Sequence, residues 1–528
     1  MTKFIFITGG VVSGLGKGVV AAGLGTLIDR SKIVIPIKCD GYLNVDPGTI
    51  NPYEHGEVYV LEDGGEVDMD FGHYERFLNI NCKFSWNLTS GKILHSLIQK
   101  ERRGEFLGKT IQIFPHVIDE IKNQWKAIAK SAGADVCLIE IGGTVGDWET
   151  QWFIEAARQL KRDVGAQNIL YTHATYVPFL NNVHELKTKP AQRDTALLRE
   201  KGILPDILWC RSDHPIDDKI LTKLGLFCDV EKVISVPDVE SIYEIPLLFK
   251  KAGVPEILSR HLGLPLRDLT EWEKLVQRIK KPADQVTIAL CGKYTDLRDS
   301  YASVIEALGH AGAHLNCGVN IKFIETTELH SIDTTGIHGI LIPGGFGSRG
   351  VEGKIQIIKH ARETKLPFLG ICLGLQLAVV EFARNVCGLT GAHSTEMDPT
   401  TPHNVVVYLP GQTDSTNKGG TMRLGTYTAN LMPGSLASHL YGANIAVERH
   451  RHRYEVNPEY HDILTQGGLV MSGMSPDKKL AEIVELQNHP YFIASQAHNE
   501  FTSRLEKPNA LFFGFVKAAL KVKQQVRK

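Results

Sequence analysis

The sequence predicts an α/β protein with two doubly wound domains, each built on a mainly parallel central sheet with flanking helices. Two observations support this fold class. Short apolar runs alternate with helix-like patterns through the first half of the chain. A polar stretch then interrupts the alternation, and a new series of strand-like and helix-like patterns follows it.

The first domain is expected over residues 1–265. Its apolar runs predict buried strands, and their alternation with helix-like patterns is typical of a parallel, doubly wound sheet. The six runs are Phe4–Thr8, Ile33–Lys38, Val136–Glu140, Ile169–Tyr171, Ile207–Cys210 and Val233–Val236.

Residues 266–285 are expected to form a linker, and residues 286–528 the second domain. The sequence around Trp272 places leucines in a polar segment that ends in Lys-Lys-Pro, which indicates a partly helical connection. The second domain then opens with three further apolar runs, Val286–Cys291, His338–Ile342 and Pro367–Ile371.

The composition is that of a globular protein. The 528 residues are enough for several domains, and 43% hydrophobic with 22% charged residues is ordinary. The net charge of −1 leaves no electrostatic footprint for nucleic acid or an anionic membrane, and the basic tail Lys521–Lys528 is better explained as a solvated helix end. No apolar run approaches the roughly 18 residues of a membrane span. We therefore expect neither nucleic acid nor a membrane as a partner.

The nine cysteines are scattered and form no CxxC pair. This distribution favours reduced thiols over a disulfide framework. The chain also starts directly with a strand pattern, without a cleavable signal. We expect a cytoplasmic location.

A glycine-rich loop, GGVVSGLGKG over residues 9–18, follows the first strand pattern and precedes a helix pattern. Glycines let backbone N–H groups approach an anion closely, and the helix N-terminus adds positive potential. Lys17 supplies a mobile charge, so the loop is suited to phosphate. It is a variant of the GxxxxGK[ST] pattern, because Gly18 stands where a hydroxyl residue normally ligates Mg²⁺.

The metal would therefore need carboxylates from elsewhere in the chain. Glu140 ends the apolar strand VCLIE at the carboxyl edge of the predicted sheet, where open α/β folds bind ligands. Asp68 and Asp70 lie in the acidic loop LEDGGEVDMDF, and Mg²⁺ favours one or two carboxylates with phosphate oxygens and water. Glu140 could instead cap the next turn, but the glycine loop favours metal binding. Spacing alone does not choose between Asp68 and Asp70.

A second reactive motif is PFLGICLGLQLA, which places Cys372 at a strand-to-helix turn between Gly370 and Gly374. This arrangement exposes a nucleophile above a sheet and beside a helix N-terminus, which favours the thiolate. A lone buried cysteine is usually just a small core residue. The flanking glycines favour the catalytic interpretation here.

The thiol needs a base, an oxyanion donor and a substrate clamp. His498 and Glu500 are two residues apart in SQAHNEF and would share one face of an extended chain, although a His-x-Glu pair alone is a weak signal. The segment ILIPGGFGSRG ends a strand in paired glycines that can offer backbone N–H groups. In ERHRHRYE, a strand would put Arg449, Arg451 and Arg453 on one face, where one of them could hold a carboxylate.

The chain resembles the CTP synthase family over essentially its whole length. Its N-terminal half is similar to the synthetase (amidoligase) domain, and its C-terminal half to a class I (triad) glutamine amidotransferase domain. The shorter stretches are weak singly, but together and in this order they are highly specific. They are GGVVSGLGKG, NVDPGT, YEHGEV, GHYERF, GGTVGD, ELKTKP, PDILWCRSD, SIYEIP, LIPGGFGSRG, GICLGLQ, GGTMRLG, ERHRHRYEVN and HNEFTS.

The resemblance implies that UTP, ATP, glutamine and water give CTP, ADP, phosphate and glutamate. ATP would phosphorylate the uracil O4, and ammonia from glutamine would displace that phosphate at C4. Cys372 would attack the glutamine amide, His498 would shuttle the proton, and Glu500 would orient the imidazole. Implied partners are UTP, ATP, L-glutamine, GTP as activator, and CTP as product and inhibitor, in a homotetramer of a family that also forms filaments.

The resemblance also implies ligand sites, residue by residue. Mg²⁺ would be held by Asp70 and Glu140, and here family similarity, not spacing, favours Asp70 over Asp68. ATP would be bound by Ser13, Gly14, Leu15, Gly16, Lys17, Gly18, Lys38, Asp70, Asp238 and Val239. UTP or CTP would be bound by Ser13, Asp147, Glu149, Lys187, Lys189, Gln192 and Lys223. Glutamine would be held by Gly345, Leu373, Gln376, Glu396 and Arg453.

Two further positions take a role from the resemblance. His55 would lie by the ammonia route between the sites, although in YEHGEV it could equally be a turn histidine. Arg423, in GGTMRLG, would belong to the lid associated with GTP activation.

Some positions depart from the family pattern. Gly41 stands where proline is expected, Trp148 and Trp152 replace smaller or different residues, and KPAQRDT departs after Gln192. Ala497 and Asn499 flank His498 where an aromatic residue and a proline are usual. These departures bear on regulation and rate more than on reaction class.

Two other functions are conceivable. A different ATP-dependent amidoligase, acting on a cofactor precursor, is disfavoured by the ELKTKP and GGTVGD stretches. A degenerate homologue kept for scaffolding is disfavoured because the chain retains Lys17, Asp70, Glu140, Cys372, His498 and Glu500.

Overall fold

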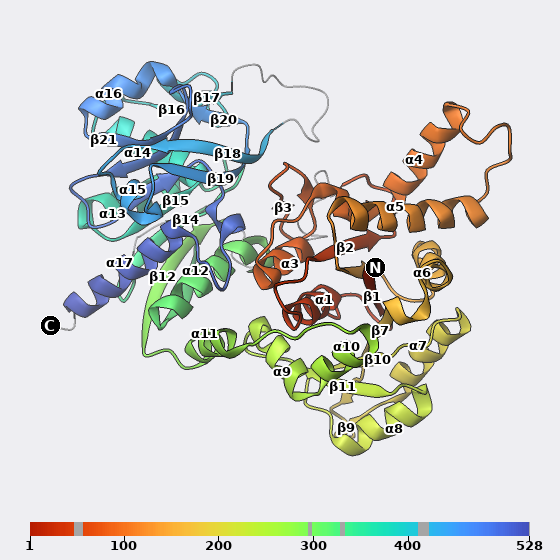
Figure 1. The fold of residues 1–528 in the computed structure, drawn as a ribbon. Coiled ribbons are helices and arrows are strands. Elements are labelled where there is room, and N and C mark those ends of the chain that lie inside the picture. The colour runs from red at the N-terminus through yellow and green to blue at the C-terminus, as the bar shows by residue number, and fades with distance from the viewer. Residues whose placement is uncertain (47–55, 294–297, 328–332, 410–421, 527–528) are drawn as a thin grey trace. The chain divides into compact units, whose positions relative to one another are not determined.

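The structure, a computed structural model, describes residues 1–46, 56–293, 298–327, 333–409 and 422–526 (Figure 1). The chain divides into two compact units. The N-terminal unit comprises Met1–Pro47 and His73–Glu273, and the C-terminal unit comprises Gly48–Gly72 and Lys274–Lys528. Within the described residues, no helix is long and apolar enough to cross a membrane.

The N-terminal unit is built on a seven-stranded, wholly parallel sheet in the order β11-β10-β7-β1-β6-β2-β5. Parallel crossovers are right-handed, so the reversal of strand order beside β1 puts helices on both faces of the sheet. All six predicted strands are confirmed. The strands are β1 (Lys3–Gly9), β2 (Val34–Asp40), β5 (Asn87–Thr89), β6 (Val136–Ile141), β7 (Ile169–Tyr176), β10 (Ile207–Ser212) and β11 (Lys232–Pro237).

Helices follow the strands of this unit as the alternating pattern predicted. They are α1 (Lys17–Thr26), α4 (Ser90–Arg102), α5 (Ile118–Ser131), α6 (Gln151–Val164), α7 (Lys189–Glu200), α8 (Asp218–Cys228), α9 (Ile245–Lys251) and α10 (Val254–Leu262). Helix α3 (Asp70–Leu78) begins three residues before His73, where the N-terminal unit resumes. A short hairpin of β8 (Phe179–Leu180) and β9 (Glu185–Leu186) precedes α7.

The C-terminal unit contains a nine-stranded sheet in the order β13-β12-β14-β15-β23-β22-β21-β18-β19. Its first five strands are parallel and the other four continue it antiparallel. The parallel strands are β12 (Asp284–Gly292), β13 (Cys317–Glu325), β14 (Gly339–Ile342), β15 (Phe368–Ile371) and β23 (Phe492–Ser495). The antiparallel strands are β18 (Arg423–Leu431), β19 (Ile445–His452), β21 (Leu469–Met474) and β22 (Ala481–Leu486).

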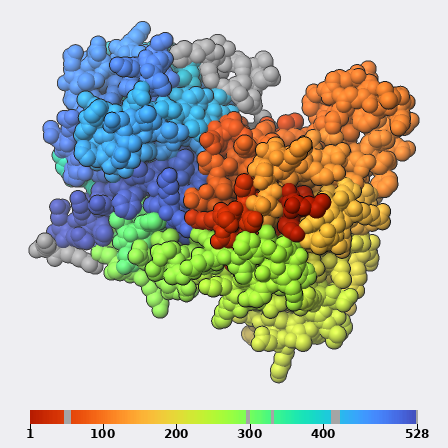
Figure 2. Space-filling view, in the orientation of Figure 1, coloured from red at the N-terminus to blue at the C-terminus, as the bar shows by residue number. Residues whose placement is uncertain are grey.

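Both faces of this sheet are covered by apolar cores. Ile340 and Ile342 belong to one buried cluster with α13 (Val351–Thr364) and α14 (Leu373–Asn385), whereas the intervening Leu341 belongs to a second cluster. The second cluster includes α12 (Ala302–Leu315) and α17 (Ala510–Val526), the dark blue C-terminal helix in Figures 1 and 2. Alternate residues of a strand point to opposite faces, so this pattern shows a sheet packed on both sides.

The smaller elements of the C-terminal unit complete it. A three-stranded sheet contains β16 (His393–Ser394), β17 (Asn404–Tyr408) and β20 (Tyr454–Val456). A two-stranded hairpin, β3 (Tyr59–Val60) and β4 (Glu66–Val67), comes from the early stretch counted with this unit. Two short helices, α15 (Leu436–Tyr441) and α16 (His461–Gln466), lie later in the chain.

The expected linker contains α11 (Thr270–Lys280), so its helical character is confirmed. Three apolar side chains of this helix are buried, namely Trp272, Leu275 and Val276. Trp272 is fully buried against Phe77 and Tyr243, with ring centroids 5.5 and 5.8 Å away, and its indole N–H donates to the Tyr243 carbonyl at 2.8 Å. The start of α11 is therefore anchored by packing rather than by polar contacts alone.

Replacing Trp272 with alanine should destabilise the N-terminal unit by about 3–5 kcal/mol, the usual cost of removing a large buried aromatic side chain. The measurement is the free energy of unfolding in urea, followed by tryptophan fluorescence and circular dichroism. Trp148 is 83% exposed, so Trp148→Ala is the matched control and should cost under about 0.5 kcal/mol. Equal losses in the two variants would contradict the anchoring role of Trp272.

Candidate functional site

Cys372 occupies the turn between β15 and α14, as the sequence predicted. Its backbone is in an uncommon conformation, with φ 51° and ψ −100°, and its N–H donates to the Ser495 carbonyl at 2.7 Å. A Cβ at the neighbouring Gly374 would lie 2.5 Å from the Ile342 carbonyl oxygen, so only glycine lets the helix start this close to β14. Such local strain persists only where the surrounding fold maintains it, and it is typical of functional turns.

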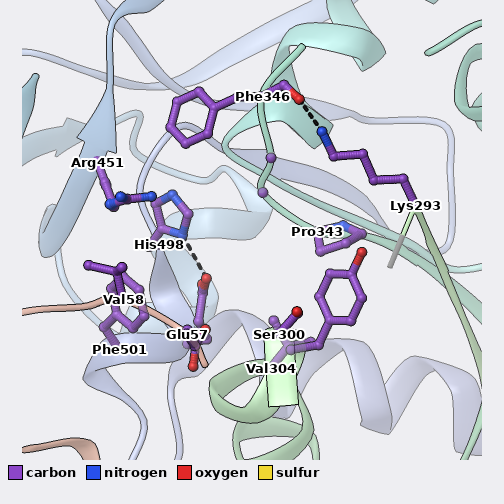
Figure 3. A pocket seen from close by; sticks show the side chains of 14 residues that line it. Glu57, Val58, Lys293, Ser300, Val304, Pro343, Phe346, Arg451, His498 and Phe501 are labelled. Atoms are coloured by element: carbon purple, nitrogen blue, oxygen red, sulfur yellow. Dashed lines mark hydrogen bonds and ion pairs between the residues drawn. The ribbon is translucent and has the colours of Figure 1, made fainter. Parts of the chain in front are cut away.

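His498 and Glu500 form a buried hydrogen-bonded pair. The imidazole Nδ1 lies 2.7 Å from Glu500 Oε1. Figure 3 shows the His498 ring with a dashed line leaving it. The expectation that an extended chain would bring them together is wrong. His498 precedes a short 3-10 helix, Asn499–Thr502, and this turn folds Glu500 back toward the ring.

The electrostatics of His498 favour the imidazolium. Burial opposes its positive charge, but the Glu500 carboxylate and the Cys372 thiol outweigh that effect and raise the pKa of His498 to about 10. Hydrogen bonds from both partners contribute to this rise. The structure therefore brings Cys372, His498 and Glu500 together, from β15, the end of β23 and the following turn.

A cavity of about 180 Å³ lies beside this triad. His498, Glu500, Arg451 and Lys293 line it with the loop Pro343–Phe346, and Lys293 Nζ donates to the Phe346 carbonyl (Figure 3). The predicted strand-end glycines thus border the triad, where backbone N–H groups could stabilise an oxyanion.

The residues expected to hold glutamine are placed in the same unit. Leu373 opens α14, and Gln376 on that helix donates to the Tyr454 carbonyl at 3.1 Å. Glu396 accepts from the Gly347 N–H at 2.8 Å, and burial raises its pKa. Gly345 borders the cavity. Leu373 and Gln376 thus lie on the helix that begins after Cys372, whereas Gly345 and Glu396 lie at the glycine-rich loop that borders the cavity.

The arginine prediction needs a correction. Arg449 and Arg451 lie on β19, but Arg453 lies in the bend between β19 and β20, because the strand ends at His452. Arg449 donates to the Val60 carbonyl at 3.1 Å, and Arg451 pairs with Glu66 at 2.9 Å. Arg453 is separated from that strand face because β19 ends one residue before it.

Sequence reasoning missed Gln496, whose amide donates to Cys372 Sγ at 3.7 Å. Its place within the motif SQAHNEF was a usable signal, since β23 ends at Ser495 directly before it. It also missed Glu57, which accepts hydrogen bonds from Ser303 at 2.9 and 2.5 Å and lines the cavity. Only the fold brings that early residue into the C-terminal unit.

In the N-terminal unit, the glycine loop turns from β1 into α1. Gly14 and Gly16 have φ values of 75° and 77°, and residues 11–14 are exposed. Lys17 opens α1, and its ammonium donates to the Gly143 carbonyl at 2.6 Å. Leu15 and Gly18 are buried, so the exposed part of the predicted phosphate site is centred on Ser13 and Gly14.

Glu140 near the end of β6 is almost fully buried and ion-paired. Its carboxylate lies 3.0 Å from Lys38 Nζ on β2 and also accepts from the Tyr74 hydroxyl. Asp70 opens α3, and its N–H donates to Asp68 at 3.4 Å. Among the described residues, no group of three His, Cys, Asp or Glu side chains could hold a metal. The carboxylates present suit Mg²⁺, which takes few protein ligands beside phosphates and water.

The residues expected to bind nucleotides beyond the loop come after strand ends of the N-terminal sheet. Asp147 follows β6 and accepts from the Thr144 N–H at 2.9 Å, and exposed Glu149 is nearby in sequence. Asp238 and Val239 follow β11, and Asp238 pairs with Arg211 at 2.7 Å. Carboxyl ends of parallel strands are where ligands of this fold bind.

The remaining predicted residues lie on or beside two helices. Lys187 pairs with Glu185 at 2.6 Å, directly before α7, and Lys189 opens that helix. Gln192, on α7, donates to Thr188 at 3.1 Å, and Lys223 is exposed on α8. His55 lies outside the described residues.

A phosphate-type loop on a parallel sheet and a Cys–His–Glu arrangement on a mixed sheet define a ligase with its own glutamine amidotransferase. Residues 3–264 match the family described as CTP synthase N-terminus, and residues 296–518 match glutamine amidotransferase class-I. The chain belongs to the CTP synthase family, and it is a glutamine-hydrolysing, ATP-dependent C–N ligase.

Relatives match over nearly full length. The chain is 54% identical to a CTP synthase of Methanococcus maripaludis, covering 98% of this chain and 99% of that protein. It is also 54% identical to a CTP synthase of Methanocaldococcus jannaschii, covering 98% of each. A solved Trypanosoma brucei CTPS glutaminase domain with bound acivicin is 36% identical, with a TM-score of 0.42, over 45% of this chain and 94% of that one.

Replacing Glu500 with glutamine should lower the pKa of His498 from about 10 toward its usual value near about 6.5, because the neighbouring negative charge is lost. Because the pKa of His498 is higher in the folded protein than in the unfolded chain, its protonation stabilises the fold fully at pH values below the unfolded pKa. This stabilisation is lost as the pH rises through the folded pKa. The wild-type free energy of unfolding should therefore fall between about pH 6.5 and 10 more steeply than that of Glu500→Gln.

The measurement is an NMR titration of His498 in both proteins, with unfolding curves across that pH range. His393 in the same unit is the internal control, and its titration should be identical in the two proteins. An unchanged His498 titration in Glu500→Gln would contradict the coupling of this pair.

Proposed function

We propose that Cys372, His498 and Glu500 are the glutaminase triad of this enzyme. The observation that carries the proposal is their convergence at the strained turn, with His498 joined to Glu500 at 2.7 Å and Gln496 donating to the Cys372 sulfur. The thiolate attacks the glutamine amide carbon, and His498 gives its proton to the departing ammonia. Water then cleaves the glutamyl thioester, which returns the thiol and releases glutamate.

Glutamine would be held by the residues around the cavity. Arg453 offers a guanidinium for the substrate carboxylate, and Glu396 a carboxylate for the substrate ammonium. Gln376 and Gly345 would orient the amide group beside Cys372. The backbone N–H of Leu373 lies at the N-terminus of α14, where an oxyanion is stabilised.

In the N-terminal unit, the glycine loop with Lys17 and Lys38 would bind the ATP phosphates, and Asp238 with Val239 the adenine side. Asp147, Glu149, Lys187, Lys189, Gln192 and Lys223 would bind UTP, or CTP as inhibitor. The γ-phosphate moves to the uracil O4, ammonia attacks C4, and phosphate leaves with the former O4 oxygen. Phosphate is a far better leaving group than oxide, which is why ATP is needed.

Mg²⁺, when bound, would neutralise phosphate charge during the transfer. Glu140 and Asp70 would hold it, since both offer the carboxylate oxygens that this cation prefers. Lys38, now paired with Glu140 at 3.0 Å, supplies a positive charge beside the same carboxylate.

The regulation of this enzyme and its assembly are proposed from its resemblance to the CTP synthase family. GTP would activate glutamine hydrolysis, with Arg423 in the responding segment, and the enzyme would act as a homotetramer able to form filaments. His55 would border the ammonia route. The cytoplasmic location stays a prediction from the cysteine content.

Replacing Cys372 with alanine should abolish glutamine-dependent CTP formation, by at least about 10³-fold, because the nucleophile is lost. Synthesis from added ammonium should continue, since the N-terminal site does not use the thiol. The measurement is CTP formation from UTP and ATP, with glutamine or ammonium as nitrogen source. Loss of ammonium-driven synthesis in Cys372→Ala would contradict this division of labour. Cys387→Ala is the matched control, because Cys387 follows the C-terminal end of α14, whereas Cys372 lies at its N-terminal end.

Replacing Lys17 with alanine should lower synthesis from both nitrogen sources by about 10²-fold or more, because phosphate binding is weakened. Lys32→Ala, a surface lysine paired with Asp135 at 3.7 Å, is the charge-matched control and should leave both rates unchanged. Glutamine hydrolysis without nucleotides should survive in Lys17→Ala. Full ammonium-driven synthesis in that variant would contradict the phosphate-binding role.

A further inference from the structure

A buried hydrogen-bond chain lies behind the glycine loop of the N-terminal unit. His173 on β7 is fully buried, with its Nδ1 2.8 Å from the Thr8 hydroxyl and its Nε2 2.9 Å from Asp194 Oδ2. Asp194 is itself only 8% exposed. Thr8 is the second-last residue of β1, directly before the loop, so the chain of contacts joins β1, β7 and α7.

The chemistry of the side chains decides which group donates in each of these hydrogen bonds. A carboxylate only accepts, so His173 Nε2 carries the hydrogen that Asp194 receives. The Thr8 hydroxyl lies 3.1 Å from the Thr172 carbonyl as well as 2.8 Å from His173 Nδ1, and its one hydrogen can serve only one of them. Each of these buried polar groups has a partner, which buried polar groups require.

Asp194 also touches the loop itself. A Cβ at Gly10 would overlap the Asp194 carboxylate, so the loop backbone is packed directly against that side chain. The Gly10 N–H meanwhile donates to the Ala174 carbonyl at 3.1 Å, on β7. The loop is therefore fixed on one side by β7 and on the other by a residue of α7.

Helix α7 carries Lys189 and Gln192, the residues proposed for the pyrimidine nucleotide, and Asp194 comes two residues later. This is also the segment where KPAQRDT departs from the family pattern. The hydrogen bond to His173 holds the Asp194 side chain in place beside the loop.

We propose that Asp194 and His173 are a positioning pair that joins the phosphate loop to α7, so that binding of ATP and binding of the pyrimidine nucleotide strengthen each other. The inference rests on the proposed function, which assigns these nucleotides to the loop and to α7. Coupling of this kind is reciprocal and commonly amounts to 5–150-fold in affinity.

The test uses full-length protein and ammonium as nitrogen source, with the KM for UTP measured at low and at saturating ATP. In the wild type, saturating ATP should lower the UTP KM about fivefold or more. In Asp194→Ala, the UTP KM should rise about tenfold at saturating ATP and lose its dependence on ATP, with kcat changed less than about threefold.

Asp194→Asn is the conservative variant and should recover most of the coupling, because an amide can donate to the other tautomer of His173. Asp206→Ala is the matched control. It also removes a largely buried carboxylate, which accepts from the Tyr171 N–H at 2.8 Å, but it does not touch the loop. Its UTP KM and ATP dependence should equal those of the wild type.

The positioning role is overturned if the wild type shows no coupling, if Asp194→Ala keeps it, or if Asp206→Ala loses it equally. If Asp194→Ala does not fold, the same coupling measured in His173→Gln decides the question, with loss expected and retention overturning the proposal. These outcomes are separate from failure of the proposed function. That failure would appear as ammonium-driven synthesis independent of Lys17.

Discussion

The close approach of backbone at the carboxyl ends of parallel strands is the constraint on which both sites depend. In the N-terminal unit β1 ends at Gly9, and in the C-terminal unit β15 ends one residue before Cys372. Each strand passes into a helix whose N-terminus points its N–H groups at the turn. The same positive end suits an anion at the turn in both units.

Buried charge in the C-terminal unit is balanced by pairing. Arg423 at the start of β18 lies 3.2 Å from Glu455 and 2.7 Å from Glu482, and burial raises the pKa of both carboxyls. Burial likewise lowers the pKa values of His450 and His452. The pKa of His498 is raised instead, because Glu500 and Cys372 favour its positive charge. This contrast supports the proposed role of His498 as the histidine of the triad.

Local signals in the sequence predicted the strands, the glycine loop and the Cys372 turn, because each depends on a few adjacent residues. Contacts between distant segments could not be read in this way. Examples are Tyr59 donating to the Phe501 carbonyl at 2.7 Å, and the His173–Asp194 pair. The departure at Gly41 has a physical reason only in the structure, since a Cβ there would lie 2.7 Å from Glu149 Cβ. Trp148 is exposed, and none of its contacts explains why it departs from the family pattern.

The central claim is that nitrogen released at Cys372 becomes the amino group made in the N-terminal unit. The most direct measurement supplies glutamine labelled with ¹⁵N in its amide, together with unlabelled ammonium in the buffer, and reads the isotope in the 4-amino group of CTP by mass spectrometry. We predict that the product carries ¹⁵N well above its share of the free ammonium pool. Product whose ¹⁵N content equals that of the pool would contradict internal transfer.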